Sequence, residues 1–234
     1  MRLSLVLNRW QASALTPNST GVQDAGLNSS THPPMKIIGL VGGIGSGKST
    51  VARLIGKRDG VTVIDADQLG HEVLRFSDVK TLIRAEWGDA PFGDDGEIDR
   101  RKMAAIVFSG TEEGNADLEK LSKISHPRIV ELLKSKIVFA KMSLVRLVVL
   151  DAPLLLEGGL DWLCDDLVFV DSPYLARIDR VLSRGWTPEE FRVRTANQLS
   201  LDDKRNAARF VIENDCSLDE LNKRIEDLFR KLFP

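Results

Sequence analysis

A glycine-rich run in this chain of 234 residues carries the side chains best suited to chemistry. The run, Gly39–Thr50, reads GLVGGIGSGKST. Glycines allow a tight turn that aims successive backbone N–H groups at phosphate oxygens. In such a loop the lysine reaches the β- and γ-phosphates of a nucleotide, and the hydroxyl after it ligates Mg²⁺. We therefore predict a nucleotide-phosphate site formed by Gly42, Gly43, Ile44, Gly45, Ser46, Gly47, Lys48, Ser49 and Thr50.

The residues on either side of this loop favour a site over a chance match. An apolar run rich in β-formers, Ile37–Val41, precedes the loop. Val51, Leu54 and Ile55 follow it at helical spacing, and Gly56 ends the pattern. Strand, glycine-rich loop and helix is the context that this motif requires. The helix would also direct the positive end of its dipole at the phosphates.

Carboxylates follow two other predicted strands. Asp65 and Asp67 come after the run Val61–Ile64, and Asp151 comes after the run Leu144–Leu150. The carboxyl ends of parallel strands are where α/β sheets bind ligands. Asp65 or Asp67 would accept a proton from an attacking hydroxyl, or would cap the next helix, and the residues alone favour capping. Asp151 resembles the acid that lies near Mg²⁺ in P-loop enzymes, a weak pattern by itself.

Two further residues are less informative by themselves. Glu157, in the run DAPLLLE, either contacts substrate or is exposed. His126 precedes Pro127, and proline suits the first turn of a helix, so the pair predicts a helix start. A lone histidine is more often structural than catalytic.

A basic segment lies near the C-terminal end of the chain. Between residues 177 and 209 there are eight basic and five acidic residues, although the whole chain has a net charge of −2. Arg177, Arg180 and Arg184 have the spacing of one helix face. The segment is either a mobile cover over a polyphosphate or an ordinary solvated helix face, and the count favours neither.

Short apolar runs alternate with helical stretches from Met35 onward. The runs are continuous, as expected of a parallel sheet covered on both faces, so the predicted class is α/β with a five-stranded parallel sheet. About eighty residues of helical character separate the second and third strands, far more than a crossover needs. The predicted strands are Lys36–Val41, Val61–Ile64, Leu144–Leu150, Leu167–Val170 and Phe210–Ile212.

These elements predict one domain with two insertions. The core comprises 35–67, 143–175 and 207–234, a helical substrate-binding insertion spans 68–142, and a small helical lid spans 176–206. Residues 1–34 lack a sustained apolar period and are expected to be disordered. They are serine-rich and poor in acids, as transit peptides are, but a dispensable tail before Met35 is favoured.

Composition excludes several classes of protein. A net charge of −2 gives no signature of nucleic-acid or membrane binding. Cys164 and Cys216 lack the spacing of a metal or redox site. No apolar run approaches the roughly 20 residues that span a bilayer. We therefore expect a cytoplasmic protein. Asn222-Lys223 is not followed by the aspartate of a GTPase. We expect a monomer or weak homo-oligomer.

Several segments, in order, resemble the dephospho-CoA kinase family from Met35 to the C-terminus. The chain departs from the family at Arg177, where glutamine is frequent, and at Arg209, where aspartate is usual. The matching segments are GLVGGIGSGKST, VIDAD, GEIDRRKMAAIVFS, ISHPRI, DAPLLLE, the Arg180/Arg184 spacing with Gln198, and ARFVIEN.

The resemblance implies a P-loop kinase that uses ATP and Mg²⁺ to phosphorylate the ribose 3′-hydroxyl of dephospho-CoA. It implies Asp67 as the base, Lys48, Arg180 and Arg184 as charge-neutralising catalytic residues, and Ser49 with Asp151 as metal ligands. Asn214 would lie near the adenine. The implied substrate-binding residues are Asp65, Arg100, His126, Pro153 and Glu157.

Two other functions remain open at the level of sequence. One is a small-molecule P-loop kinase with a different acceptor. The other is a nucleotide-binding regulatory protein without turnover, against which the intact Lys48, Ser49 and Asp67 argue.

Overall fold

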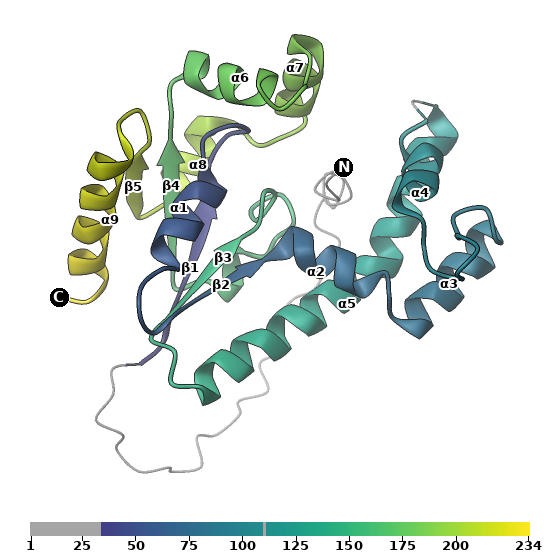
Figure 1. Ribbon diagram of the computed structural model, residues 1–234, viewed down its shortest axis with the longest axis horizontal. Coiled ribbons are helices and arrows are strands. Elements are labelled where there is room, and N and C mark those ends of the chain that lie inside the picture. Colours follow the sequence, from purple (N-terminus) through teal and green to yellow (C-terminus); the bar gives the residue numbers. More distant parts are fainter. Residues whose placement is uncertain (1–33, 110) are drawn as a thin grey trace.

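The computed structural model describes residues 34–109 and 111–234. The expected disorder of residues 1–34 therefore falls, except for Pro34, outside the described part. Five parallel strands form a sheet of order β2-β3-β1-β4-β5 (Figure 1). The predicted α/β class and five-stranded parallel sheet are confirmed. The strands are β1 Lys36–Val41, β2 Val61–Asp65, β3 Leu147–Asp151, β4 Asp166–Asp171 and β5 Phe210–Glu213.

Both faces of the sheet are covered, which explains the continuous apolar runs. Every residue of β3 is buried. Val148 and Leu150 pack into a cluster on one face, whereas Leu147 and Val149 pack into a cluster on the other. Alternate residues of a strand point to opposite faces, so a strand with two buried faces needs apolar residues throughout.

Helices α1 (Lys48–Ile55) and α9 (Leu218–Leu232) contribute to the second of these clusters. Helix α9 is amphipathic, and its Leu221, Ile225 and Leu228 are buried at helical spacing. A capping box of Ser217 and Glu220 starts the helix. This face fixes α1, and therefore the loop that precedes it.

The first insertion connects β2 to β3 through four helices that extend away from the sheet (Figure 1). Helix α5, with 31 residues, runs from these helices back to the sheet and contacts α2, α3, α4 and β2. The helices are α2 Ala66–Val73, α3 Ser77–Trp87, α4 Arg100–Val107 and α5 Glu112–Met142.

Two details of this insertion differ from the sequence prediction. Pro127 lies inside α5 and does not start a helix; Thr111 caps the helix instead, by accepting from the Gly114 N–H. The proline signal is local, whereas residues buried on both sides of Pro127, such as Ser125 and Ile129, keep the helix continuous through it. Strand β3 begins at Leu147, because Leu144 has a φ of 56° in the turn after α5.

The second insertion, between β4 and β5, contains α6 Tyr174–Leu182, α7 Pro188–Ala196 and α8 Leu201–Ala207. Helix α6 ends at Leu182, so Arg184 lies in the following turn. The predicted common face of Arg177, Arg180 and Arg184 is therefore wrong. Arg177 is buried, Arg180 is half-buried and Arg184 is exposed.

Within residues 34–109 and 111–234, no helix combines the length and the apolar character that crossing a bilayer requires.

Candidate functional site

The predicted phosphate-binding loop joins β1 to α1 at the carboxyl edge of the sheet. Lys48, the first residue of α1, folds back over the loop. Its Nζ donates to the carbonyl oxygens of Gly42 at 2.9 Å and Gly43 at 3.1 Å. These bonds hold the ammonium over the loop, where it can meet the terminal phosphates of a nucleotide.

Gly47 is required at the start of α1 by both conformation and space. Its φ is 93°, in the left-handed region that side chains disfavour. A Cβ at this position would lie 2.1 Å from Nδ2 of Asn214. The Asn214 amide can therefore approach the loop closely, and its Nδ2 donates to the Ser46 carbonyl at 2.7 Å.

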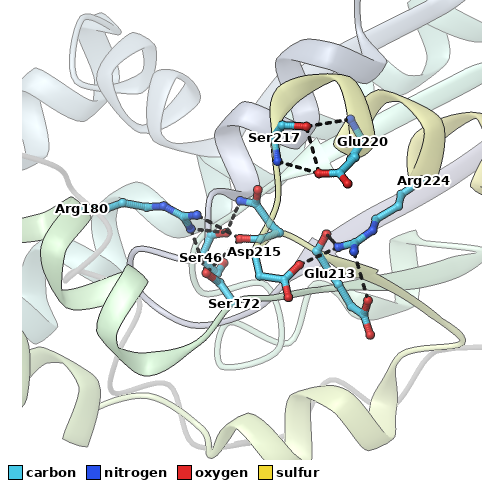
Figure 2. Close-up of polar contacts among 9 residues, drawn as sticks. Ser46, Ser172, Arg180, Glu213, Asp215, Ser217, Glu220 and Arg224 are labelled. Atoms are coloured by element: carbon cyan, nitrogen blue, oxygen red, sulfur yellow. Dashed lines mark hydrogen bonds and ion pairs between the residues drawn. The ribbon is translucent and has the colours of Figure 1, made fainter.

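Arg180 joins the loop to β4 and to the end of β5 (Figure 2). Its Nη1 donates to the carbonyl oxygens of Gly45 at 3.1 Å and Ser46 at 3.3 Å, and to Ser172 Oγ at 2.9 Å. Its Nη2 donates to the Asn214 carbonyl at 2.9 Å. In this conformation the predicted charge-neutralising arginine supports the loop from its carbonyl side.

The segment that carries Asn214 is itself fixed. Arg224 Nη1 donates to the Glu213 carbonyl at 2.6 Å and to Asp215 Oδ1 at 2.7 Å (Figure 2). The Ser217–Glu220 capping box follows at once. Asn214 is buried and its side chain is committed to the loop. Its predicted contact with adenine stays a prediction.

Lys48 lies in an unusual electrostatic environment. Burial is the main cause that lowers the pKa of Lys48 to about 8, and the nearby cations Lys204 and Arg177 lower it further. Asp151 and Glu157 oppose this shift. A site that holds several cations close together, away from water, is suited to a polyanion.

Lys204 and Glu157 form a buried ion pair beside Lys48. The Lys204 Nζ lies 2.7 Å from Glu157 Oε1 and donates to Gln198 Oε1 at 3.1 Å. Glu157 Oε1 also accepts from the Leu199 N–H. Glu157 thus binds the second insertion through Lys204. The sequence left open whether Glu157 is exposed or contacts substrate. The prediction of exposure is wrong, and the contact with substrate stays a prediction.

The strand-end carboxylates converge as expected. Asp65 and Asp151 lie opposite one another in the register of β2 and β3, and Asp151 is also opposite Leu40 of β1. Asp65 caps α2 by accepting from the N–H groups of Asp67 at 2.9 Å and Gln68 at 3.2 Å. The sequence left open whether Asp65 or Asp67 caps the helix. Asp65 is the cap, and Asp67 lies in the first turn of α2.

A pocket of about 620 Å³ opens in the first insertion. Arg100 lines it, together with His71, Leu74, Arg75, Asp95, Glu97 and Ile98. Burial and the nearby Arg100 lower the pKa of His71, and its Nε2 is buried with no hydrogen-bond partner among the described residues. Two guanidinium groups and an imidazole are the donors of this pocket, and its lining also holds the carboxylates of Asp95 and Glu97.

The structure separates some of the other predicted site residues. His126 is half-buried in α5 and does not belong to the described lining of this pocket; burial lowers its pKa. Pro153 is half-buried in the turn after β3, two residues beyond Asp151. The exposed Arg184 forms no side-chain hydrogen bond or ion pair with residues 34–109 or 111–234.

Three residues of these two sites were not predicted from the sequence: Lys204, His71 and Arg75. In the sequence, Lys204 is only one of the basic residues of the segment 177–209. No local pattern marks a lysine whose partner is 47 positions away, so only the fold reveals the pair with Glu157.

The chain is similar to known proteins over most of its length. A family model described as dephospho-CoA kinase matches residues 36–220. A dephospho-CoA kinase from Deinococcus radiodurans is 38% identical over 206 residues, which are 88% of this chain and 95% of the relative. Another, from Dehalococcoides mccartyi, is 33% identical over 198 residues, 84% of this chain and 98% of the relative. A crystal structure from Thermus thermophilus, 32% identical, has a TM-score of 0.71 and covers 86% of this chain and 100% of its own.

Proposed function

Because this chain belongs to the dephospho-CoA kinase family, we propose that it transfers the terminal phosphoryl group of ATP to the ribose 3′-hydroxyl of dephospho-CoA. The products are coenzyme A and ADP. The observation that carries this function is family membership over nearly the whole described chain, together with a glycine-rich loop that Asn214 and Arg180 hold in place. A regulatory protein without turnover is disfavoured because Lys48 and the strand-end acids are positioned together.

The chemistry of phosphoryl transfer consists mainly of positioning and charge neutralisation. In the proposed mechanism, the amides of Gly42–Lys48 bind the β- and γ-phosphates, and the Lys48 ammonium neutralises the charge that develops between them. Asp67 orients the 3′-hydroxyl and accepts its proton. Arg184, which is exposed in this conformation, reaches the phosphates when the lid closes.

The acceptor has an anionic part that needs its own site. We assign it to the 620 Å³ pocket, where Arg75, Arg100 and His71 supply the donors although Asp95 and Glu97 also line it. Helix α2 begins at the Asp65 cap and includes both Asp67 and His71, so one helix links the proposed base to the pocket. This arrangement supports 68–142 as the substrate-binding insertion, and we propose 176–206 as the lid.

The residues at the carboxyl edge fit Mg²⁺. Magnesium prefers oxygen ligands and is held by one or two protein groups together with substrate phosphates and water. Ser49 supplies a hydroxyl beside Lys48, and Asp151 supplies a carboxylate close enough to raise the pKa of Lys48. Bound Mg²⁺ would neutralise phosphate charge.

ADP release on addition of dephospho-CoA tests this function directly. The product should be coenzyme A, one phosphate heavier than the acceptor. Lys48→Ala should abolish turnover with little change in Tm, because its charge acts on phosphates and not on packing. A panel of nucleosides and other hydroxyl acceptors serves as the control. Faster turnover of any of these acceptors than of dephospho-CoA would show that the enzyme is a P-loop kinase with a different substrate.

A further inference from the structure

Arg177 is buried against the phosphate-binding loop. Only 5% of the residue is exposed. A Cβ at Gly43 would lie 2.3 Å from Nη1 of Arg177, so the guanidinium occupies space that any other residue at position 43 would fill. Helix α6 thus places an arginine directly on the second residue of the loop.

Two of the three guanidinium nitrogens of Arg177 have no hydrogen-bond partner among the described residues. Its Nε and Nη1 are buried and make no hydrogen bond to residues 34–109 or 111–234. Its neighbours include the rings of Tyr174 and Phe191, whose centroids lie 5.8 Å and 5.9 Å from its Cζ. Asp171, the nearby carboxylate, pairs with Arg205 at 2.6 Å.

Buried guanidinium groups are usually paired, because loss of hydration costs free energy. Arg177 instead lies close enough to another cation, Lys48, to lower the pKa of that lysine. Lys204 has the same effect, but its charge is compensated by Glu157. The charge of Arg177 is balanced only in part, by Asp171, which also pairs with Arg205, and its buried donors lie beside the loop, where an anion would complete the arrangement.

We propose that Arg177 is an additional phosphate-binding residue of this enzyme, which donates to the terminal phosphate of bound ATP. This inference rests on the nucleotide site proposed above. Arg180 is engaged with carbonyl oxygens and Arg184 is exposed, so Arg177 is the arginine of α6 whose donors are buried beside the loop without partners among the described residues. It would discriminate ATP from ADP, since only ATP supplies the γ-phosphate.

Nucleotide affinities of Arg177→Gln and Arg177→Met test this role. Wild-type and variant proteins are titrated with ATP and ADP in a calorimeter, in the absence of dephospho-CoA. Loss of a charged hydrogen bond to the γ-phosphate should lower ATP affinity about 10–100-fold and leave ADP affinity nearly unchanged. Arg192→Gln removes an exposed arginine of α7 and should change neither affinity.

Thermal unfolding without nucleotide separates binding from packing. Methionine keeps the apolar stem and removes a buried charge without hydrogen-bond partners, so the Tm of Arg177→Met should equal or exceed that of the wild type. A lower Tm with equal losses of ATP and ADP affinity would show a structural role and overturn the proposal. An unchanged ratio of ATP to ADP affinity would also overturn it.

The two variants keep the test decisive if one fails to fold, because the affinity ratio of the other is then compared with the wild type. Failure of both to fold would itself contradict the proposal, which predicts no loss of stability. The wild type reports separately on the proposed function. If it bound neither nucleotide, the nucleotide site would be wrong; if it bound both and the variants kept its affinity ratio, only the role of Arg177 would be wrong.

Discussion

The ammonium of Lys204 lies 2.7 Å from Oε1 of Glu157, and both side chains are almost fully buried, with 2% and 9% exposed. Glu157 follows β3 and Lys204 lies in α8, so this pair fastens the second insertion to the core. A buried pair of this kind contributes little relative to an apolar pair, but removal of one partner leaves the other charge buried and alone.

Glu157→Gln should therefore destabilise the protein strongly. We expect a loss of about 3–5 kcal/mol in the free energy of unfolding, measured by urea denaturation. Lys204→Met in the same background removes the stranded charge and should restore most of the loss. Equal destabilisation by the single and double variants would show that the two charges are not coupled. An unaltered stability with a raised KM for dephospho-CoA would instead support Glu157 as a substrate-binding residue.

ATP binding should take up protons at alkaline pH. Burial lowers the pKa of Lys48 to about 8, so at pH 9 much of this lysine is neutral in the free enzyme. Bound phosphates favour its charged form and raise its pKa again. Calorimetry in buffers of different ionisation enthalpy should show proton uptake at pH 9 and little at pH 6.5, where the lysine is already charged.

Lys48→Arg is the matched control for this measurement, because guanidinium stays protonated at both values of pH. Its uptake at pH 9 should be much smaller than that of the wild type. The same uptake in both proteins would assign the proton to another group.

Asp67→Asn tests the proposed base. The structure gives the N-cap of α2 to Asp65, so substitution of Asp67 leaves the cap in place. If Asp67 orients and deprotonates the 3′-hydroxyl, kcat should fall by roughly 10²–10⁴ while Tm and ATP affinity change little. A general base loses activity when it is protonated, so the fall in rate at low pH should also disappear in Asp67→Asn.

Asp65→Asn provides the comparison, since asparagine caps a helix about as well as aspartate. It should retain most of kcat. A large loss in Asp65→Asn, with near-normal turnover in Asp67→Asn, would transfer the base to Asp65.

Arg180 and Arg184 should differ although they are four positions apart. Arg180 donates to three carbonyl oxygens and a hydroxyl around the loop, so Arg180→Ala should weaken ATP and ADP binding alike and lower the Tm. Arg184 is exposed, so Arg184→Ala should lower kcat without lowering nucleotide affinity or stability. Identical effects of the two substitutions would contradict this division of roles.

The sheet and the phosphate-binding loop could be predicted because their signals are local. A parallel strand covered on both faces is apolar throughout, and a phosphate-binding loop needs glycines at fixed spacing. The strand-end acids followed from the same logic, because parallel strands present their carboxyl ends at one edge.

The rest depended on contacts between distant segments. Arg177 was grouped with Arg180 and Arg184 by helical spacing, but its burial is decided by the packing of α6 on Gly43. The Lys204–Glu157 pair joins two segments that share no sequence pattern. Pro127 gave a helix-start signal that is valid locally, and only the contacts of α5 with its neighbours show that the helix continues through it.

The uninterrupted course of α5 limits how the enzyme can move. At 1.5 Å per residue, its 31 residues form a rod about 46 Å long that joins the substrate-binding helices to the sheet. Proline at position 127 removes one hydrogen bond from the middle of that rod, where bending costs least. Movement of the far end of α5 relative to the sheet would therefore involve rotation of the whole rod or flexure at Pro127. A rotation of about 10° would displace its far end by about 8 Å, which makes α5 a lever between acceptor binding and the catalytic edge.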